Sequence, residues 1–391
     1  MNALFLTMRK IFPMNDGAFI YSFGILKYLK EHDMEISFVS FYEKEPYSTD
    51  EEKKLLEVCK SVDCVKLNWR STALNLSLKY PNNIRKYTRN AMVYLLNQKK
   101  EEHFDVVIID HLQMFEYAKL FPNSKIVLIE HNVESKIWEN YAEKCKGIIK
   151  YLVQRSATMT KKYEIEAISQ ADAVVSIAET DAEYLSSISG RRDIAVMHPY
   201  NKYQLVKTEA DIKNRTKKIL FVGSYGWYPN QQAAKFLATE LMPILEKKVA
   251  GIQLYLVGKD PTPEIMKYAE EDKSIIVTGV VDSVDPYIKE ADIFINAMFD
   301  GSGMNIKMME AMGKGIPLIT SDFGRRGIDL IDGKEALVFS NADDCAEKIE
   351  MLLNDVCVSI SLAKNARKFY LQFIEPDNTV YHAFFKLENM L

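Results

Sequence analysis

Residues 300–319 read DGSGMNIKMMEAMGKGIPLI, and the fold is most readily predicted from this stretch. An apolar run at 292–298 precedes it and predicts a buried strand, and the glycines that follow predict a tight turn into a helix carrying Lys307 and Glu310. Glycine lets a ligand approach the backbone closely, and the first N–H groups of a helix attract anions. The stretch therefore predicts a phosphate or diphosphate site, although a plain strand–turn–helix connection stays open.

Length and composition indicate a globular protein of two domains. The chain has 391 residues, is 48% hydrophobic and 27% charged, and has a formal net charge of −4. Its five cysteines form no CxxC pair, which fits a reducing cytoplasm. No apolar run approaches the roughly 18 residues that span a bilayer, and the short apolar start is expected to be a strand and not a signal peptide.

Short apolar runs rich in β-branched residues alternate with helical stretches, the pattern of parallel sheets buried on both faces. In the first half, strands are predicted at 2–8, 35–41, 105–110, 125–130 and 173–178. In the second half, they are predicted at 218–224, 252–259, 274–279, 292–298, 317–322 and 336–340. We expect an α/β protein of two Rossmann-like domains.

The domain boundary is predicted at a polar, irregular segment, 201–218. The first domain is expected to comprise residues 1–200 together with a C-terminal helix, 375–391, and the second residues 201–374. The final stretch is interrupted by Pro376, and its helical pieces are expected to cross back onto the first domain.

Two further places are candidate ligand contacts, because ligands of open α/β sheets bind beyond the carboxyl ends of the strands. The loop 15–17 follows the first predicted strand, and a plain turn explains it equally well. Glu130, His131 and Asn132 follow the strand at 125–130, and a histidine there can donate a hydrogen bond to a substrate. His111 has a similar position. A purely structural histidine is the alternative.

Residues 66–100 contain eight Lys/Arg and no Asp or Glu, with Trp69, Tyr80, Tyr87 and Tyr94 among them. Residues 144–162 form a second basic stretch, with two turns of helix expected around YLVQR. Basic helices with aromatic residues suit an anionic membrane surface or an anionic acceptor, and a solvated helix face is the alternative. No nucleic-acid-binding motif is present, and the chain is slightly acidic, so a nucleic-acid partner is not expected.

Together these stretches resemble a known family. FVGSYGWYPNQQAAKFLATELMPIL, EHNVESKIW, SIAETDAEYL, VTGVVDSVDPYIKEADIFI and GSGMNIKMMEAMGKGIPLIT are similar, in order, to segments of the retaining glycosyltransferases of family four, also called glycosyl transferases group 1. These bacterial hexosyltransferases have the GT-B fold. The resemblance covers essentially the whole chain and implies two Rossmann-like domains facing across a deep cleft, with acceptor sites in the first and the nucleotide-sugar donor site in the second.

The resemblance implies a role for each matching residue. Gly17 matches a glycine loop that faces the donor phosphates and sugar, and His131 matches a histidine that contacts the donor sugar. Lys307 matches part of a cradle for the diphosphate and sugar, and Glu310 matches the glutamate that holds the ribose hydroxyls. The rest of the cradle is the backbone of Gly301, Ser302, Gly303 and Met304, and the nucleotide base is expected beside Gly279, Val280 and Val281.

The chain departs from the family pattern in two places. Ser302 stands eight positions before Glu310, where many members have a glutamate that binds the transferred sugar. The loop at 224–230 lacks the Arg and Lys that clamp the diphosphate in many members. Ser224, Asn230 and Lys259 are therefore expected to line the donor site, with Lys307 and the helix dipole carrying the charge.

The resemblance implies direct transfer of a hexose, with retention, from a nucleotide-diphosphate sugar to a saccharide or polyprenyl-linked acceptor of bacterial surface glycans. No cofactor is expected. No metal is expected either, since the sequence contains no Asp-x-Asp pair. The expected location is the cytoplasm, in contact with the inner membrane. Two alternatives remain: a non-catalytic relative that stabilises a partner transferase, and a nucleotide-sugar epimerase.

Overall fold

A computed structural model of the chain describes residues 1–12, 17–68, 81–300 and 305–386. The chain divides into two compact units: unit 1 is Met1–Asn201 with Glu375–Leu391, and unit 2 is Lys202–Ile374. The predicted loop residues Asn15 and Asp16, much of the first basic stretch, and the cradle residues Gly301, Ser302, Gly303 and Met304 lie outside the described residues.

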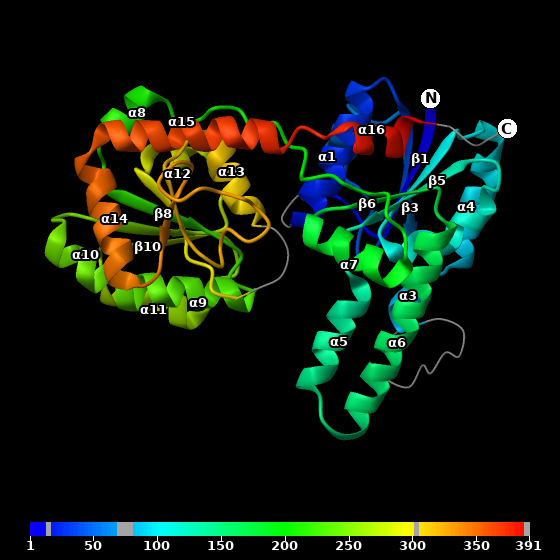
Figure 1. Cartoon of the computed structure of the whole chain (residues 1–391), viewed down its shortest axis with the longest axis horizontal. Coiled ribbons are helices and arrows are strands. Elements are labelled where there is room, and N and C mark those ends of the chain that lie inside the picture. Colours follow the sequence, from blue (N-terminus) through cyan, green and yellow to red (C-terminus); the bar gives the residue numbers. More distant parts are fainter. Residues whose placement is uncertain (13–16, 69–80, 301–304, 387–391) are drawn as a thin grey trace. The chain divides into compact units, whose positions relative to one another are not determined.

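Unit 1 is built on a parallel sheet of seven strands in the order β3-β2-β1-β4-β5-β6-β7 (Figure 1). The strands are β1 (Asn2–Thr7), β2 (Glu35–Tyr42), β3 (Ser61–Lys66), β4 (Val106–Asp110), β5 (Lys125–Glu130), β6 (Ala173–Ser176) and β7 (Ile194–Val196). Every residue of β4, β5 and β6 is buried, as expected for central strands covered by helices on both faces. The predicted doubly covered parallel sheet is confirmed for this half.

Helices cover both faces of the unit 1 sheet. They are α1 (Gly17–Glu31), α2 (Thr49–Leu56), α3 (Asn82–Tyr87), α4 (Asn90–Lys99), η1 (Lys100–Glu102), η2 (Leu112–Leu120), α5 (Glu134–Lys144), α6 (Gly147–Gln170), α7 (Glu179–Ser189) and α16 (Asn378–Phe385). Side chains of α1, α2 and α16 pack into one hydrophobic core, and those of α4, η2, α6 and α7 into the other.

Unit 2 has a parallel sheet of six strands in the order β10-β9-β8-β11-β12-β13. The strands are β8 (Lys218–Val222), β9 (Gln253–Val257), β10 (Ile275–Gly279), β11 (Ile293–Asn296), β12 (Leu318–Ser321) and β13 (Leu337–Phe339). All six lie within the predicted apolar runs. In this order the chain turns back between β8 and β11, the kind of switch point at which open α/β sheets bind ligands.

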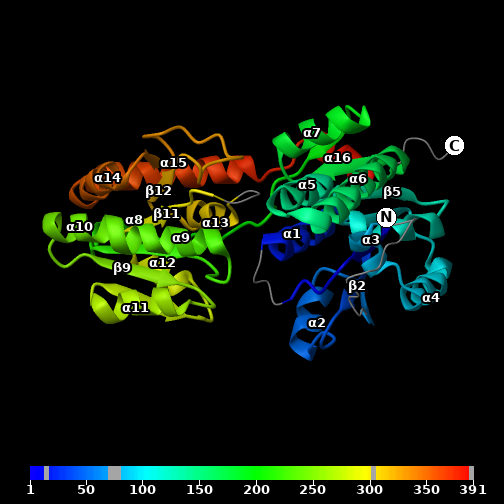
Figure 2. The same ribbon diagram turned by 90° about the horizontal axis from the view of Figure 1, so that it is seen from below.

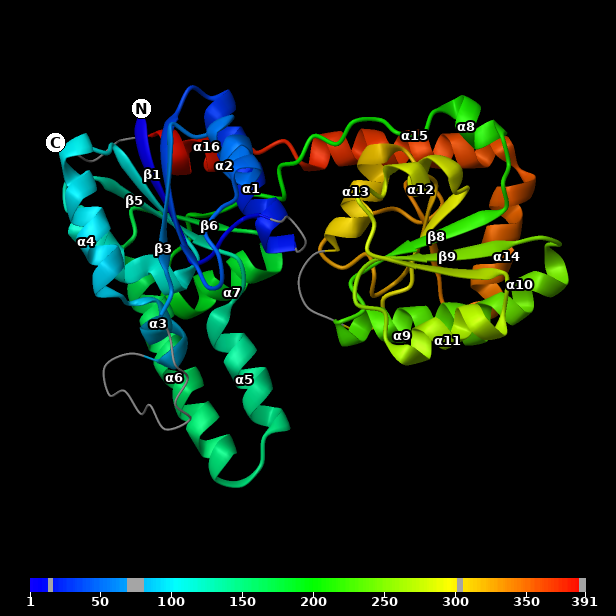
Figure 3. The same ribbon diagram turned by 180° about the vertical axis from the view of Figure 1, so that it is seen from behind.

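The helices of unit 2 lie on the two faces of its sheet (Figures 2 and 3). They are α8 (Glu209–Lys213), α9 (Tyr228–Phe236), the π-helical turn η3 (Leu237–Leu241), α10 (Met242–Lys248), α11 (Pro263–Glu271), α12 (Asp285–Glu290), α13 (Ile306–Lys314), α14 (Ala342–Asn354) and α15 (Val356–Phe373). Residues of α9, α10 and α14 form the core on one face, and residues of α12, α13 and α15 form the core on the other.

The C-terminal segment returns to unit 1, as predicted. After α15 ends, Asp377 caps α16 by accepting hydrogen bonds from the backbone N–H groups of Thr379 and Val380. Helix α16 contacts β6 and β7. Lys125 Nζ donates to the carbonyl oxygens of His382 and Lys386, at 3.0 and 2.7 Å, and so ties the last turn of α16 to the start of β5.

Two strands were not predicted, and two local expectations need correction. Strands β3 and β7 were not predicted, because both are edge strands with half-exposed residues and short apolar patterns. The segment 201–218 is not wholly irregular: it contains α8, which Thr208 and Asp211 begin with a capping box. The two turns of helix expected around YLVQR belong to α6, a helix of 24 residues.

Two cations in the described part of the first basic stretch form ion pairs with acidic residues. Lys86 Nζ lies 2.8 Å from Glu43 Oε1, and Lys99 Nζ lies 2.8 Å from Asp63 Oδ2. These acids come from other parts of unit 1 and offset part of the positive charge of the stretch. No helix in the described ranges is long and apolar enough to span a membrane.

Candidate functional site

Polar residues of unit 1 meet where β4 and β5 end. Asp110 is the last residue of β4, and His131 follows β5, its neighbour in the sheet. His131 Nε2 lies 2.5 Å from Asp110 Oδ1, and Ser22 Oγ, from α1, donates to Asp110 Oδ2 at 2.8 Å. Asp110 and His131 are both buried. The predicted site residue His131 thus belongs to a hydrogen-bonded cluster, and Gly17 begins the helix that supplies Ser22.

His111 completes this cluster. Its ring stacks on that of His131 with centroids 3.7 Å apart, and its Nδ1 lies 2.6 Å from the carbonyl oxygen of Asp110. His111 has a backbone φ of 92°, which is uncommon for a residue other than glycine. Such strained positions concentrate at functional sites. His111 therefore supports the assignment of this strand edge as a site.

The hydrogen bonds fix the protonation of the cluster. Burial opposes ionisation of Asp110, but the two histidines outweigh burial and hold the pKa of this carboxyl well below its usual range. Burial, reinforced by His111 and opposed by Asp110, lowers the pKa of His131 to about 4. At neutral pH the carboxylate of Asp110 must accept a hydrogen from His131 Nε2, so Nδ1 carries the lone pair. Nδ1 is buried and has no hydrogen-bond partner among the described residues.

The same three side chains form a candidate set of metal ligands. One ligand atom each from Asp110, His111 and His131 lies within 4.8 Å of the others, close enough in principle for one ion. Two imidazoles and a carboxylate would suit zinc or iron. The 2.5 Å contact between His131 and Asp110 is, however, a hydrogen bond, and two ligands of one ion would need to move apart from it. The geometry of the described residues therefore favours a hydrogen-bonded cluster.

Buried carboxyl groups lie next to this cluster. Ser135 Oγ donates to Glu164 Oε2 at 2.5 Å, linking α5 to α6. Burial raises the pKa of Glu164 to about 7, although hydrogen bonds from Ser135 oppose the change. Burial also raises the pKa of Glu130 well above its usual range, and Glu164, Glu134 and Asp181 add to this. Burial therefore makes these carboxyl groups less charged at neutral pH than exposed ones, and Glu164 accepts hydrogen bonds from Ser135.

In unit 2, Lys307 and Asn230 form the centre of a second site. Lys307 lies in the first turn of α13, and its Nζ donates to Asn230 Oδ1 at 2.6 Å. The ammonium lies 4.6 Å from the ring centroid of Phe221, a residue of β8. Asn230 is buried, and its Nδ2 donates to the carbonyl oxygen of Ser224 at 2.8 Å. The structure therefore brings the predicted residues Ser224, Asn230 and Lys307 together.

Burial lowers the pKa of Lys307 to about 7. Among the described residues no carboxylate forms an ion pair with it, so an incoming anion would be its first opposite charge. A cation desolvated in this way binds an anion more strongly than an exposed lysine would. The site has the properties of an anion-binding site.

Glu310 lies one turn beyond Lys307 on α13. Its Oε1 accepts a hydrogen bond from Lys314 Nζ at 2.5 Å, and Lys314 also pairs with Asp285 of α12 at 2.5 Å. The side chain of Glu310 is about one-fifth exposed, so part of the carboxylate is accessible. The structure thus holds Glu310 in place through one oxygen. The predicted role with ribose hydroxyls stays a prediction.

The loops after β8 and β9 approach each other through Gly223 and Gly258, and the loop after β10 begins at Gly279. A Cβ on Gly258, which has a φ of +143°, would lie 1.8 Å from the carbonyl oxygen of Gly223. Gly279 ends β10 with a φ of +70°, and the side chain that follows, Val280, is 78% exposed. Lys259 accepts a backbone hydrogen bond from Tyr225 at 2.9 Å. An exposed valine next to a left-handed glycine suits a flat apolar ligand such as a base.

A buried network supports the chain on either side of 301–304. Asn296 Nδ2 and Asn305 Nδ2 both donate to the carbonyl oxygen of Gly324, at 3.1 and 2.8 Å. Ser321 Oγ donates to the carbonyl oxygen of Met298. A Cβ on Gly324 would clash with Thr320 and Asn296, so only glycine fits. Sequence reasoning missed this network, because its members are small polar residues on separate elements.

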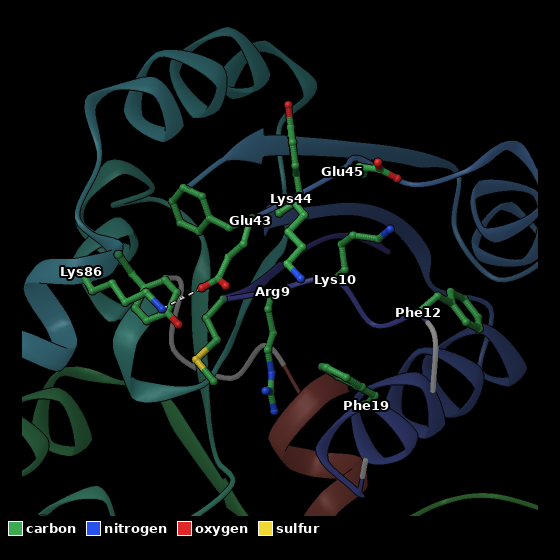
Figure 4. Close-up of a pocket in the computed structure, with 12 residues that line it drawn as sticks. Arg9, Lys10, Phe12, Phe19, Glu43, Lys44, Glu45 and Lys86 are labelled. Atoms are coloured by element: carbon green, nitrogen blue, oxygen red, sulfur yellow. Dashed lines mark hydrogen bonds and ion pairs between the residues drawn. The ribbon is translucent and has the colours of Figure 1, made fainter. Parts of the chain in front are cut away.

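A cavity of about 600 Å³ lies in unit 1 where β1, β2 and α3 end (Figure 4). Its lining includes cationic, acidic and aromatic residues: Arg9, Lys10, Phe12, Phe19, Glu43, Lys44, Glu45, Lys86 and Tyr87. Figure 4 shows Lys86 and Glu43 paired at its edge, and Arg9 lies 4.4 Å from the ring centroid of Phe19. Aromatic faces beside charged groups are suited to a polar ligand with flat hydrophobic faces, such as a sugar. The sequence predicted no pocket here.

Comparison with known proteins places these features in a family. Residues 216–355 match the family model described as glycosyl transferases group 1. Over 391 residues, and 96% of both chains, the protein is 23% identical to an uncharacterised 44.6 kDa protein of the cps region of Klebsiella pneumoniae.

Two solved structures share the fold over nearly the whole chain. HepE of Anabaena in complex with UDP-glucose is 12% identical, with a TM-score of 0.65, covering 97% of this chain and 96% of that one. WaaG, a glycosyltransferase involved in lipopolysaccharide biosynthesis, is 15% identical, with a TM-score of 0.63, covering 97% and 98%. The predicted GT-B fold is confirmed. Residues 216–355, most of unit 2, thus match the glycosyl transferases group 1, and both units have the fold of these solved structures.

Proposed function

We propose that the enzyme transfers a hexosyl group, with retention of configuration, from a nucleoside diphosphate sugar to a saccharide or lipid-linked acceptor of a bacterial surface glycan. The structure of HepE with UDP-glucose supports a uridine donor. The relative from a cps region and the role of WaaG in lipopolysaccharide biosynthesis support a surface glycan as product.

The observation that carries the proposal is Lys307 in the first turn of α13, held by Asn230 and without a carboxylate partner among the described residues. The diphosphate of the donor would bind Lys307 and the N-terminal N–H groups of α13. As the bond to the sugar breaks, negative charge develops on the leaving diphosphate. A fixed cation and fixed dipoles stabilise that charge more than they stabilise the bound donor.

In unit 1, His131 would contact the transferred sugar. Asp110 fixes the orientation of the imidazole through Nε2–H, and His131 would contact the sugar through its ring or its backbone carbonyl. A neutral ring held beside an anionic Asp110 also tolerates the positive charge that develops on the sugar ring. The acceptor hydroxyl would attack from the side of the leaving group, and a phosphate oxygen of the donor would take its proton. No step requires a metal ion or another cofactor.

The acceptor would bind in the cavity beside β1 and β2. Its aromatic lining can stack on a sugar, and its cationic residues suit an acceptor that carries phosphate or carboxylate. The proposed acceptor is a saccharide on a polyprenyl carrier, so the proposed location is the cytoplasmic face of the inner membrane.

A panel of nucleotide sugars, each measured for thermal stabilisation and slow donor hydrolysis, tests the proposal. A transferase should be stabilised by one donor and release nucleoside diphosphate from it. A non-catalytic partner protein should hydrolyse none, and an epimerase should convert the sugar without releasing diphosphate. Either of the last two results would contradict the proposal.

Glu310→Gln tests the ribose contact. Because a charge-assisted hydrogen bond would become a neutral one, nucleoside diphosphate binding should weaken by about 1–3 kcal/mol while the fold is kept. Calorimetric titration with UDP alone measures this. The matched control is Glu290→Gln, on α12 of the same unit, which pairs with Lys218 at the opposite end of β8 and should bind UDP as the wild type does. Equal affinity in Glu310→Gln and the control would remove Glu310 from the site.

A further inference from the structure

Helices α5 and α6 form an antiparallel hairpin that extends away from the sheet of unit 1 (Figures 1 and 3). The C-terminal half of α6 is anchored in the core, where Tyr163, Ala167 and Ile168 are buried. The first six residues of α6 include no buried side chain. Since α6 has 24 residues and rises about 1.5 Å per residue, it is about 36 Å long, and its N-terminal turns lie well beyond the core.

The outer part of this hairpin exposes large apolar side chains. Five of them are exposed there: Ile137, Tyr141, Ile148, Ile149 and Tyr151. Ile148 is 76% exposed, Tyr151 66% and Ile149 58%, values unusual for residues of this size in one short segment. Single exposed apolar residues are normal on a protein surface, but a cluster marks an interaction surface. We call residues 141–151 the hairpin tip.

Basic residues lie next to the apolar side chains of α6, and Glu143 is exposed next to Tyr141 on α5. The segment 144–162 contains six Lys/Arg and no Asp or Glu: Lys144, Lys146, Lys150, Arg155, Lys161 and Lys162. Lys146 and Lys150 are exposed on either side of Ile148 and Ile149. By contrast, Lys86 and Lys99 of the first basic stretch are paired with acids of unit 1. At the hairpin tip, cations and large apolar side chains are therefore exposed together.

This combination fits an anionic bilayer. Isoleucine side chains partition into the acyl boundary, tyrosine rings favour the headgroup region, and lysines near the surface are attracted to anionic lipid. A second protein would need a complementary acidic and apolar face, and a tip of a few residues offers a small area for a stable protein interface. Charge complementarity and shape both favour the lipid surface.

We propose that the hairpin tip inserts into the headgroup region of an anionic membrane and that this element, and not residues 81–100, attaches the enzyme to the bilayer. The inference rests on the proposed function only in that the acceptor is membrane-borne. If the enzyme is attached through this one hairpin, substrates can still reach the carboxyl ends of the strands near His131 and the residues of the cavity.

Sedimentation with vesicles of phosphatidylglycerol or of phosphatidylcholine tests the proposal. The wild type should bind the anionic vesicles at low salt and the neutral ones weakly. Two double variants should each bind anionic vesicles at least about tenfold more weakly: Ile149→Ser/Tyr151→Ser and Lys146→Gln/Lys150→Gln. In the lysine variant, the remaining binding should no longer depend on salt. Matched controls are Leu56→Ser, an exposed apolar residue of α2, and Lys235→Gln/Lys247→Gln in unit 2, which should bind within about twofold of wild type.

A fluorescent label reports on insertion directly. Cys145 lies in the turn of the hairpin, and Cys357 is exposed on α15 of unit 2. An environment-sensitive dye on Cys145 in a Cys357→Ser background should shift to the blue with anionic vesicles and be quenched by nitroxide-labelled lipid. The same dye on Cys357 in a Cys145→Ser background should do neither.

Three results would overturn the proposal. The first is no binding of the wild type to anionic vesicles at low salt, and the second is unchanged binding in both hairpin variants. The third is a change of oligomeric state in the hairpin variants without vesicles, which would assign the tip to a second copy of the chain. Donor hydrolysis measured without vesicles separates this inference from the proposed function. Vesicle binding without donor hydrolysis contradicts the transferase, whereas donor hydrolysis without vesicle binding contradicts the hairpin.

Discussion

Among single residues, Lys307 has the most direct consequence for function. Its ammonium is held by the amide of Asn230 and is desolvated, and burial lowers its pKa to about 7. An anionic diphosphate placed beside it would raise that pKa again, because the opposite charge favours the protonated amine. Donor binding should therefore be coupled to proton uptake.

The predicted coupling can be measured with UDP. Above pH 7 the free enzyme carries a partly neutral Lys307, so binding should take up a proton and affinity should fall by up to about tenfold per pH unit. Below pH 7 the lysine is already charged and the dependence should flatten. Calorimetry in two buffers of different ionisation enthalpy gives the proton count. In Lys307→Met both the affinity and the proton uptake should be lost; an unchanged proton count in this variant would show that another group titrates.

Variants of the cluster around His131 distinguish an effect on turnover from an effect on nucleotide binding. His131→Ala should lower turnover sharply and leave UDP affinity nearly unchanged, because the residue lies in unit 1 and is proposed to contact the sugar and not the nucleotide. Asp110→Asn keeps the volume but removes the charge that fixes the imidazole, so it should also lower turnover and shift the pH profile. Steady-state kinetics and UDP titration of each variant are the measurements. Equal loss of both quantities in a folded variant would assign the cluster a structural role.

The sequence predicted this site only in part. His131 and Lys307 could be inferred because each follows a recognisable strand and turn. Asp110 could not, because its partners Ser22 and His131 are 88 and 21 residues away in the chain and meet only through sheet order. The polar end of an otherwise apolar strand was the available signal.

At the level of helices and strands, burial explains what periodicity predicted and what it missed. The central strands are apolar on both faces and were predicted from that pattern. The edge strands β3 and β7 are half exposed, so their sequences SVDCVK and IAV lack the signal. The outer half of α6 exposes apolar residues on more than one side, which obscured its helical period and led to a helix far shorter than the observed one.

The contact between Ser135 of α5 and Glu164 of α6 leads to a testable effect on stability. Glu164 has a folded pKa of about 7, raised from 4.5 chiefly by burial. Because the pKa of Glu164 is higher in the folded state, the folded protein binds more protons than the unfolded chain between about pH 4.5 and pH 7. The contribution of Glu164 to stability is therefore fully present below about pH 4.5 and is lost as the pH rises through 7. Glu164→Gln should remove this dependence and make the protein more stable than wild type at pH 8, by up to about 3 kcal/mol.

Urea unfolding at pH 5 and pH 8 measures this effect. Glu166→Gln, an exposed neighbour on α6, is the matched control and should show the wild-type pH dependence. If Glu164→Gln lost as much stability between pH 5 and pH 8 as the wild type does, the titrating group would lie elsewhere.

On the scale of the whole molecule, the sequence predicted two parallel α/β units and the return of the C-terminal helix to unit 1. The alternation of strands and helices sufficed for the units, and Pro376 marked the break before α16. The contacts that anchor α16 could not be predicted, since Lys125 binds carbonyl oxygens more than 250 residues away in sequence. Such long-range contacts depend on the completed fold.

The stereochemistry of donor hydrolysis tests the central claim most directly. With the nucleotide sugar that the panel identifies, proton NMR at early times resolves the anomer released before mutarotation. A retaining glycosyltransferase acting on an α-linked donor should release nucleoside diphosphate together with the α-anomer. His131→Ala should slow the release of both products by the same factor. Initial release of the β-anomer, or release of diphosphate at the same rate in His131→Ala and in the wild type, would contradict the account.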